Sequence, residues 1–515
     1  MTPRANAHVL EHITLALPLH TYREAFPPGR GGFVLDSRTS AGEDVSLLGA
    51  EPFLAFRAFR SDHRIASGAL GARVEIEERG AIVRAEVDDA FDVVRALLRE
   101  HAVDPAVFPK DRPLPLLAGA VGYIGYETGQ MLERLPCHER PGIGMADIAL
   151  FFHDWVLGRS RRTGDTWLSV VGRAPTTGEA RLAAERARDR VLSILAAFER
   201  EHATRSRPSR SVLAPVPDPG LFSHTPRAAY LANILTAKRH IDDGNAFEIC
   251  LTHRMDAPFS GDPFALWQEL RHANPAPFAT FLDLPEGAVV SSSPERFLSL
   301  DAARVAESRP IKGTRPRGET PEEDARLAAE LATSTKDRAE NAMIVDLVRN
   351  DLGRVCRFGS VEAPQLFAVE RYATVHQLVS TVRGALDDGR DAIDLVRACF
   401  PPGSMTGAPK IEAMSILEGI EPTERGVYAG ALGWLDFSGT IDLSVVIRTI
   451  VVKNGVAHLH VGGAIVSDSA PAAEHDETMH KARALLAALA TFADTAAEPA
   501  ASRAARAGAE VGQSP

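Results

Sequence analysis

The sequence predicts an α+β fold built on antiparallel sheets. The stretch LSVVIRTIVVKNGVAHLHVGGAIV, residues 443–466, places Asn454 and Gly455 between two runs rich in β-branched residues. An Asn-Gly pair between apolar runs is typical of a β-hairpin closed by a type I′ turn. Over 221–494, helical and strand patterns alternate without the regular rhythm that parallel βαβ units need. Hairpins among irregularly spaced helices favour the α+β class.

The sequence of residues 1–205 predicts one domain that contains both strands and helices. Strand patterns occur in GGFVLDS, in ARVEIEERGAIVRAEV and in the glycine-rich LLAGAVGYIGYETG, and helical patterns occur in DDAFDVVRALLREH and TGEARLAAERARDRVLSILAAFEREH. Residues 206–220 are rich in Arg, Ser and Pro and predict a linker. The segment 221–494 then predicts a second domain, and the low-complexity residues 495–515 predict a disordered tail.

Composition excludes several classes of function. The chain has 515 residues and a net charge of −11, which disfavours general binding to a nucleic-acid backbone. The sequence has no apolar leader at its start and no apolar run of about 18 residues, so we expect neither secretion nor a membrane span. The four cysteines match no zinc or disulfide spacing and predict reduced thiols in a cytoplasmic protein: Cys137, Cys250, Cys356 and Cys399.

Two helical patterns each carry a pair of acids. STKDRAENAMIVDLVRNDLGR begins with Ser334 or Thr335 near its cap and has Asp337 and Glu340 on one face. SAPAAEHDETMHKARALLAAL begins its helix at Pro471, with Glu474 and Glu477 at the same spacing. Acids in a first turn commonly cap the helix and complement its dipole. Two facing pairs would instead suit Mg²⁺, and spacing alone leaves both interpretations open.

The run FPPGSMTGAPKIEAMSIL is a turn that leads into a helix, with Pro409 as the expected first helical residue. The free backbone N–H groups there, with Thr406 and Lys410, predict either an anion site or an ordinary junction. Arg448 lies in a run that is apolar on both faces and predicts a central strand. Its buried guanidinium would need an anion, either a protein carboxylate or a ligand.

Two further residues have both an ordinary and a catalytic interpretation. His376 lies in a strand pattern, where a histidine is usually a satisfied core residue. Lys312 lies in the basic loop RPIKGTRPRG, which predicts a solvated turn. A lysine fixed in a cleft by proline and glycine would instead have a lowered pKa and expose a nucleophilic amine.

Several motifs coincide in order and together resemble the chorismate-utilising enzymes over about 221–490. They are SSSPERF, RPIKGTRPRG, KDRAENAMIVDLVRNDLGRV, VERYATVHQLVSTVRG, FPPGSMTGAPK, RGVYAGALGWLDFSG, IRTIVV, GGAIVSDSAPAAEHDET and HKA. FVLDS, LLGAEPF and GAVGYIGYE resemble, more weakly, the N-terminal domain of anthranilate synthase component I and its aminating relatives. The resemblance implies a large two-sheet α/β sandwich, with 221–494 as the chorismate-binding catalytic domain.

The resemblance also implies roles for particular residues. Glu340 and Glu477 correspond to Mg²⁺ ligands, and Asp337 and Glu474 to their supporting acids. Tyr428 and Arg448 correspond to positions that hold the substrate's carboxylates. The remaining matches are substrate-binding Thr406, Lys410, Lys481 and the backbone of Gly462, Gly463 and Ala464, the active-site His376, and Glu295, the acid that assists loss of the C4 hydroxyl.

Two positions indicate the subfamily. Glu248 stands where isochorismate and salicylate synthases carry a water-activating lysine, and P-I-K-G-T resembles aminodeoxychorismate synthases, whereas anthranilate synthases usually read P-I-A-G-T. The implied reaction has Mg²⁺ on the ring carboxylate, attack of Lys312 at C2 as the hydroxyl leaves C4, and attack of ammonia at C4. Ammonia is expected from a separate glutamine amidotransferase subunit, and anthranilate formation is the alternative outcome.

Overall fold

The computed structural model describes residues 5–37, 45–78, 81–202, 220–372 and 375–492. The expected linker, apart from Gly220, and the expected tail at 495–515 lie outside the described residues. No helix in these described ranges is long and apolar enough to cross a membrane.

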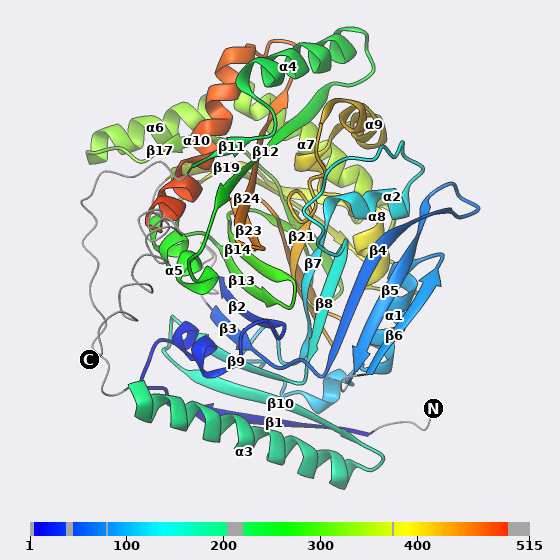
Figure 1. Ribbon diagram of the computed structural model, residues 1–515, viewed down its shortest axis with the longest axis vertical. Helices are drawn as coiled ribbons and strands as arrows, with labels where there is room; N and C mark the ends of the chain where they lie inside the picture. Colours follow the sequence, from blue (N-terminus) through cyan, green and yellow to red (C-terminus); the bar gives the residue numbers. More distant parts are fainter. Residues whose placement is uncertain (1–4, 38–44, 79–80, 203–219, 373–374, 493–515) are drawn as a thin grey trace, which may run out of the picture.

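Two twelve-stranded sheets form the centre of the molecule, and every pairing between described strands is antiparallel. The first runs in the order β1 (Ala5–Ile13), β10 (Thr166–Ala174), β9 (Trp155–Ser160), β3 (Val45–Gly49), β2 (Gly32–Ser37), β13 (Phe278–Leu284), β14 (Gly287–Ser293), β23 (Thr449–Lys453), β24 (Val456–Ile465), β12 (Glu248–Pro258) and β11 (Phe222–Ser223), with β20 (Gly407–Ala408) beside β12. The second runs in the order β17 (Ile311–Pro316), β19 (Val375–Ala385), β16 (Val305–Arg309), β15 (Arg296–Leu300), β22 (Ile441–Val445), β21 (Ala431–Asp436), β7 (Gly119–Ile124), β8 (Ile148–His153), β4 (Leu54–Arg64), β5 (Leu70–Glu78) and β6 (Ala81–Val87), with β18 (Glu362–Arg371) beside β19. The predicted α+β class with a two-sheet sandwich is confirmed (Figure 1).

Both halves of the chain contribute to both sheets. In the first sheet β2 pairs with β13, and in the second β7 pairs with β21. The largest apolar cluster also mixes the halves, because it contains Phe33 and Phe152 together with Leu298 and Val445. The two segments predicted as domains are therefore joined strand to strand and share one core.

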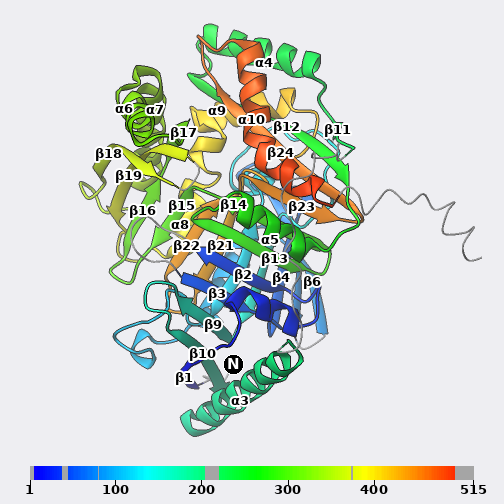
Figure 2. The ribbon, with the colours of Figure 1, turned by 90° about the vertical axis from the view of Figure 1, so that its left-hand side faces the viewer.

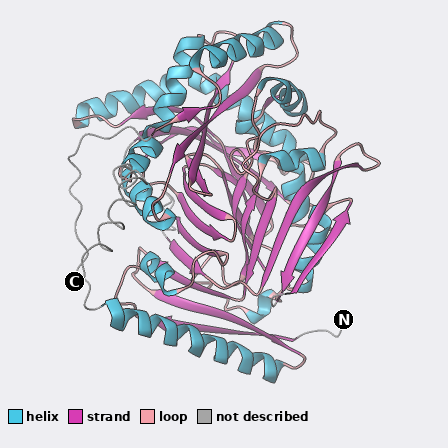
Figure 3. Cartoon of the chain, viewed as in Figure 1, coloured by secondary structure: helices cyan, strands magenta, loops and turns pink. Residues whose placement is uncertain are grey.

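The helices lie around the outside of the strands (Figure 3). They are α1 (Ala90–Glu100), α2 (Gly129–Leu132), α3 (Thr177–His202), α4 (Arg227–Asp242), α5 (Pro263–Ala273), α6 (Pro321–Thr333), α7 (Thr335–Gly353), α8 (Ala392–Cys399), α9 (Lys410–Ile420) and α10 (Pro471–Ala490), with 3₁₀ turns η1 (Leu19–Ala25), η2 (Pro105–Val107), η3 (Tyr126–Thr128) and η4 (Gly403–Met405). Helix α3 packs on β10 and β1, while α5 packs on β14 and α10 on β24 (Figure 2). On the second sheet, α7 packs on β17 and β19.

The predictions that depend only on neighbouring residues, a hairpin turn, a helix cap and a helix start, are confirmed. Asn454 and Gly455 have φ angles of 50° and 78° between β23 and β24, as a type I′ turn requires. Ser334 caps α7 by accepting a hydrogen bond from the backbone N–H of Asp337, and α10 begins at Pro471. Pro409 is one residue outside α9, as its N-cap, and not its first helical residue.

The prediction of a central strand through Arg448 is wrong. The chain leaves β22 in the second sheet at Val445 and enters β23 in the first sheet at Thr449. Arg448 lies in the connection between them, with φ at 52° in the left-handed region. A segment that crosses between two packed sheets is covered on both faces, so its apolar pattern resembles that of a buried strand.

Candidate active site

Lys312 and Glu248 form an ion pair that connects the two sheets. Lys312 lies on β17 of the second sheet and donates from Nζ to Oε1 of Glu248, at the start of β12, across 2.6 Å. The Lys312 side chain is 11% exposed and that of Glu248 is fully buried, so the lysine does not lie on a solvated turn. Gly313 permits this position because a Cβ there would lie 2.8 Å from the Asp337 side chain on α7.

The protonation state of Lys312 differs from the sequence prediction. Burial lowers the pKa of Lys312, but Glu248 and then Glu340 outweigh that effect, and the net pKa is raised. The predicted lowering is therefore wrong, because the lysine meets carboxylates where the sequence interpretation assumed cations or an apolar wall. As an ammonium, Lys312 has to transfer a proton before its nitrogen can attack, and Glu248 Oε1 is the nearest acceptor.

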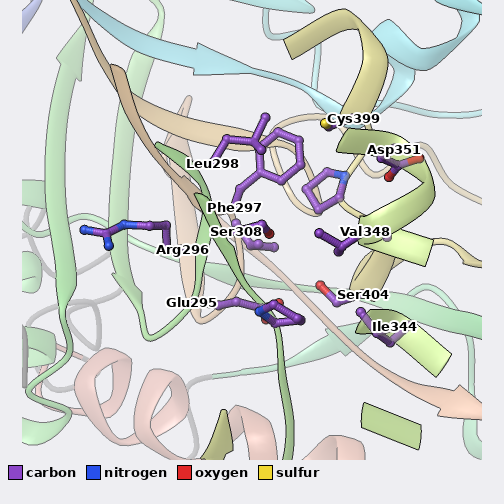
Figure 4. Close-up of a pocket in the computed structure, with 14 residues that line it drawn as sticks. Glu295, Arg296, Phe297, Leu298, Ser308, Ile344, Val348, Asp351, Cys399 and Ser404 are labelled. Carbon is purple, nitrogen blue, oxygen red and sulfur yellow. The ribbon is translucent and has the colours of Figure 1, made fainter. Parts of the chain in front are cut away.

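Glu295 lies between β14 and β15 and is suited to act as an acid near neutral pH. Burial raises its pKa to about 7, against the opposing effects of a hydrogen bond from Ser404, the charge of Lys312 and the backbone at Ile311. Ser404 lies beside Glu295 at one end of a small cavity that ends at Asp351 and Cys399 (Figure 4). A carboxyl group with this pKa carries a proton about half of the time at neutral pH.

Arg448 and Tyr428 form a second part of the site. Arg448 donates from Nη1 to the carbonyl oxygen of Lys481 at 2.9 Å, and within the described ranges no carboxylate lies at ion-pair distance from it. Burial lowers the pKa of Arg448, opposed by Tyr428 and Glu477. The Tyr428 ring stacks on His460 with centroids 5.2 Å apart. Of the two possible partners for this guanidinium, a protein carboxylate is therefore not found among the described residues.

The four acids on α7 and α10 each have a partner. Asp337 pairs with Arg315 at 3.1 Å, and Glu474 accepts a hydrogen bond from Ser469 at 2.7 Å. Glu340 lies 3.9 Å from Lys336, and Glu477 lies 2.9 Å from Lys481. Among the residues whose placement is described, no three or more metal-ligating side chains gather as they would around an ion.

Glu340 and Glu477 are nevertheless affected by the charges of the same lysines. Burial raises the pKa of Glu340, and Lys312 and Lys336 act against that rise. Burial also acts to raise the pKa of Glu477, but Lys481, Lys336 and Lys312 outweigh it and the net pKa is lowered. Lys312 and Lys336 therefore act on both carboxylates, one from α7 and one from α10.

The backbone predicted to bind substrate lies along β24. Cys250, Leu251 and Thr252 of β12 pair with Ala464, Gly463 and Gly462. Thr406 is buried and accepts the N–H of Cys250 at 3.0 Å, and Lys481 Nζ donates to the carbonyl of Gly462 at 2.9 Å.

Two other predicted residues have structural partners. Lys410 Nζ contacts Asp351 and the carbonyls of Cys399 and Pro401 at 2.7, 2.5 and 2.8 Å. These contacts use its three N–H groups, so Lys410 holds the loop before α9 and has no donor left for a ligand. His376 is fully buried on β19, with Nε2 2.9 Å from Asp324, and its Nδ1 has no hydrogen-bond partner among the residues that the structure describes.

Sequence reasoning missed two contributors. The sequence identifies Glu248 only as a position that lacks lysine. Its pairing with Lys312 joins residues 64 apart in the chain, and no periodic pattern predicts such a pair. Ser404 lies inside the motif FPPGSMTGAPK, which is its only sequence signal.

A model of the chorismate binding enzyme family matches residues 56–487. The aminodeoxychorismate synthase of Streptomyces griseus is 40% identical over 474 residues, which cover 90% of this chain and 62% of that protein. The chain therefore spans less than two thirds of that relative. Aminodeoxychorismate synthase component 1 of Klebsiella aerogenes is 38% identical over 79% of this chain and 84% of its own. The crystal structure of anthranilate synthase component I from Streptococcus pneumoniae TIGR4 superposes with a TM-score of 0.70 at 27% identity, covering 87% of this chain and 93% of that chain.

Proposed function

This chain belongs to the family of chorismate binding enzymes, and on that basis we propose that it converts chorismate and ammonia to 4-amino-4-deoxychorismate. The observation that carries the proposal is the buried amine of Lys312, 2.6 Å from Glu248 and close enough to Glu295 to oppose the rise of its pKa. An amine between two acids is suited to forming and breaking a covalent bond to substrate.

The proposed binding of chorismate uses its carboxylates. Arg448 offers a guanidinium without a protein carboxylate at ion-pair distance among the described residues, and Tyr428 lies near enough to act on its pKa. A buried guanidinium gains most from a charged hydrogen-bond partner. The backbone of 462–464, fixed by β12 and Lys481, would line the other side.

We propose Mg²⁺ as cofactor, held by Glu340 and Glu477, with Asp337 and Glu474 in support. The donor set fits, because Mg²⁺ prefers carboxylate oxygen and water, and the two ligands already lie near the same lysines. When bound, the ion would supply positive charge to the ring carboxylate of chorismate. The Lys481 ammonium, now 2.9 Å from Glu477, would then lose that partner.

The proposed reaction proceeds in two displacements. Lys312 passes a proton to Glu248, its nitrogen bonds to C2, and the C4 hydroxyl leaves as water with a proton from Glu295. Ammonia then bonds to C4 and the bond between C2 and Lys312 breaks. Glu295 takes a proton from the new ammonium, and Glu248 returns one to Lys312. The sum is chorismate plus ammonia giving the amino product plus water.

We further propose that ammonia comes from a separate glutamine amidotransferase subunit. The name component 1 on the K. aerogenes relative supports a second component, as does the extra length of the S. griseus relative. A cytoplasmic location is proposed with it, supported by the free thiols of Cys137, which is exposed, and of the buried Cys250, Cys356 and Cys399.

The test is the product formed from chorismate, Mg²⁺ and ammonium. We expect a compound that an aminodeoxychorismate lyase converts to p-aminobenzoate, with no product when ammonium is omitted. Fluorescent anthranilate with equimolar pyruvate would overturn the proposal and assign the chain to the anthranilate synthase branch, which the likeness to the S. pneumoniae structure favours.

A further inference from the structure

A turn in the first half of the chain, residues 125–127, is hydrogen-bonded to the turn at residues 425–428, which carries Tyr428. The backbone N–H of Tyr126, the first residue of η3 after β7, donates to the carbonyl of Gly426 at 2.8 Å. The next residue, Glu127, accepts the N–H of Arg425 at Oε1 across 2.7 Å and the N–H of Gly426 at Oε2 across 2.8 Å. Gly125 allows this approach, because a Cβ there would lie 2.8 Å from the Gly426 carbonyl.

The clamped turn ends at Tyr428. The N–H of Tyr428 donates to the carbonyl of Arg425 at 3.2 Å, and Gly426 adopts a φ of 61° between them. The consecutive N–H groups of Arg425 and Gly426 therefore donate to the one carboxylate of Glu127. The conformation of this turn fixes the position of the Tyr428 backbone, from which its side chain extends.

The side chain of Arg425 ties the same turn to the rest of the site. Its guanidinium donates to the carbonyl of Cys250 on β12 at 2.7 Å, to the carbonyl of Met405 before Thr406 at 2.6 Å, and to Glu421. The Tyr126 ring lies 4.2 Å from the same guanidinium. A displacement of the turn would therefore also affect β12, which pairs with the backbone of 462–464, and the segment that leads to Thr406.

We propose that Glu127 is a positioning residue for chorismate: its carboxylate holds the Arg425–Tyr428 turn in the conformation that binds the substrate. The inference rests on the proposed role of Tyr428 in the site. Glu127 acts at a distance from the reacting atoms, so it controls affinity and not the chemical steps. A carboxylate accepts two N–H groups at once, whereas a protonated carboxyl or an amide turns one of its two positions into a donor.

This arrangement makes chorismate affinity dependent on pH. Burial raises the pKa of Glu127 to about 7, opposed first by Arg60. The charged groups that act on it are Arg60 of β4, Arg140 of the connection after α2, 3.9 Å away, and Glu424 of the loop after α9. Asp147, before β8, pairs with the same Arg60. Below about pH 7 the carboxyl is protonated and loses one N–H contact, so affinity falls as pH falls. Protonation of Glu295 removes negative charge near the substrate and would act in the opposite direction.

The experiment measures the dissociation constant of chorismate in Mg²⁺ between pH 6 and 8. Glu127→Gln should weaken binding about tenfold at pH 8, because a hydrogen bond to a charged acceptor is lost. The difference in affinity between the wild type and Glu127→Gln should shrink towards pH 6, where Glu127 is itself protonated. Glu295 is present in both proteins, so its protonation affects both affinities alike. Glu418→Gln is the matched control: Glu418 is a buried carboxylate that also pairs with Arg140, but it binds no N–H of this turn, so binding should be unchanged.

A double-mutant cycle separates positioning from general damage. If Glu127 acts through Tyr428, Glu127→Gln should have little further effect once Tyr428→Phe is present. Additive effects, or a ratio of wild-type to Glu127→Gln affinity that is constant from pH 6 to 8, would overturn the inference. If Glu127→Gln does not fold, Glu127→Asp is compared with the wild type in the same way, because its shorter carboxylate cannot reach both N–H groups. Failure of the wild type to bind chorismate would instead count against the proposed function.

Discussion

The two ends of the candidate site differ in how their charges are balanced. At one end, Lys312 is already paired with Glu248, and Glu295 lies near enough for the lysine to affect its pKa. At the other end, Arg448 contacts only a carbonyl oxygen among the described partners. In the proposed reaction the first end exchanges protons between groups of its own, and the second is proposed to bind a carboxylate of the substrate. Chemistry and binding are thus assigned to different residues, which substitutions can separate.

Removing the amine should give the largest effect. Lys312→Ala is expected to lower kcat by at least about 10³-fold, as loss of a covalent nucleophile does, while chorismate still binds. Steady-state turnover with ammonium and a binding titration would check the two expectations separately. Lys336→Ala is the control, because Lys336 also acts on Glu340 and Glu477 but is 57% exposed. Turnover unchanged in Lys312→Ala would exclude the lysine as nucleophile.

The same contrast shows what the sequence could predict. The hairpin at Asn454 and the start of α10 at Pro471 depend on neighbouring residues, so a short pattern predicted them. The pKa of Lys312 depends on Glu248, which comes from the other sheet, and a reading of its own loop predicted the wrong direction. The predicted strand at Arg448 is wrong for a related reason. A segment that crosses between two sheets and a central strand are both buried on two faces, so both have the same apolar sequence pattern.

The binding end should respond differently, with a smaller effect on a different quantity. Arg448→Gln removes the guanidinium and should cost roughly 1.5–3 kcal/mol of chorismate binding, a weakening of about 10-fold to 150-fold. Arg383→Gln is a suitable control, because Arg383 is 50% exposed and forms a surface ion pair with Glu307. Equal affinity of wild type and Arg448→Gln in a calorimetric titration would show that this end does not hold the substrate's carboxylate.

The smallest expected effect concerns the proton on Glu295. With a pKa of about 7, Glu295 is protonated below neutral pH, so kcat should be constant there and fall about tenfold per pH unit above it. The hydrogen bond from Ser404 stabilises the charged form and lowers that pKa, so Ser404→Ala should move the alkaline limb upward, by up to roughly one pH unit. The kcat profile of the two proteins between pH 6 and 9 measures the shift. A limb that moves to lower pH would contradict the assignment, because the serine would then be stabilising the protonated acid.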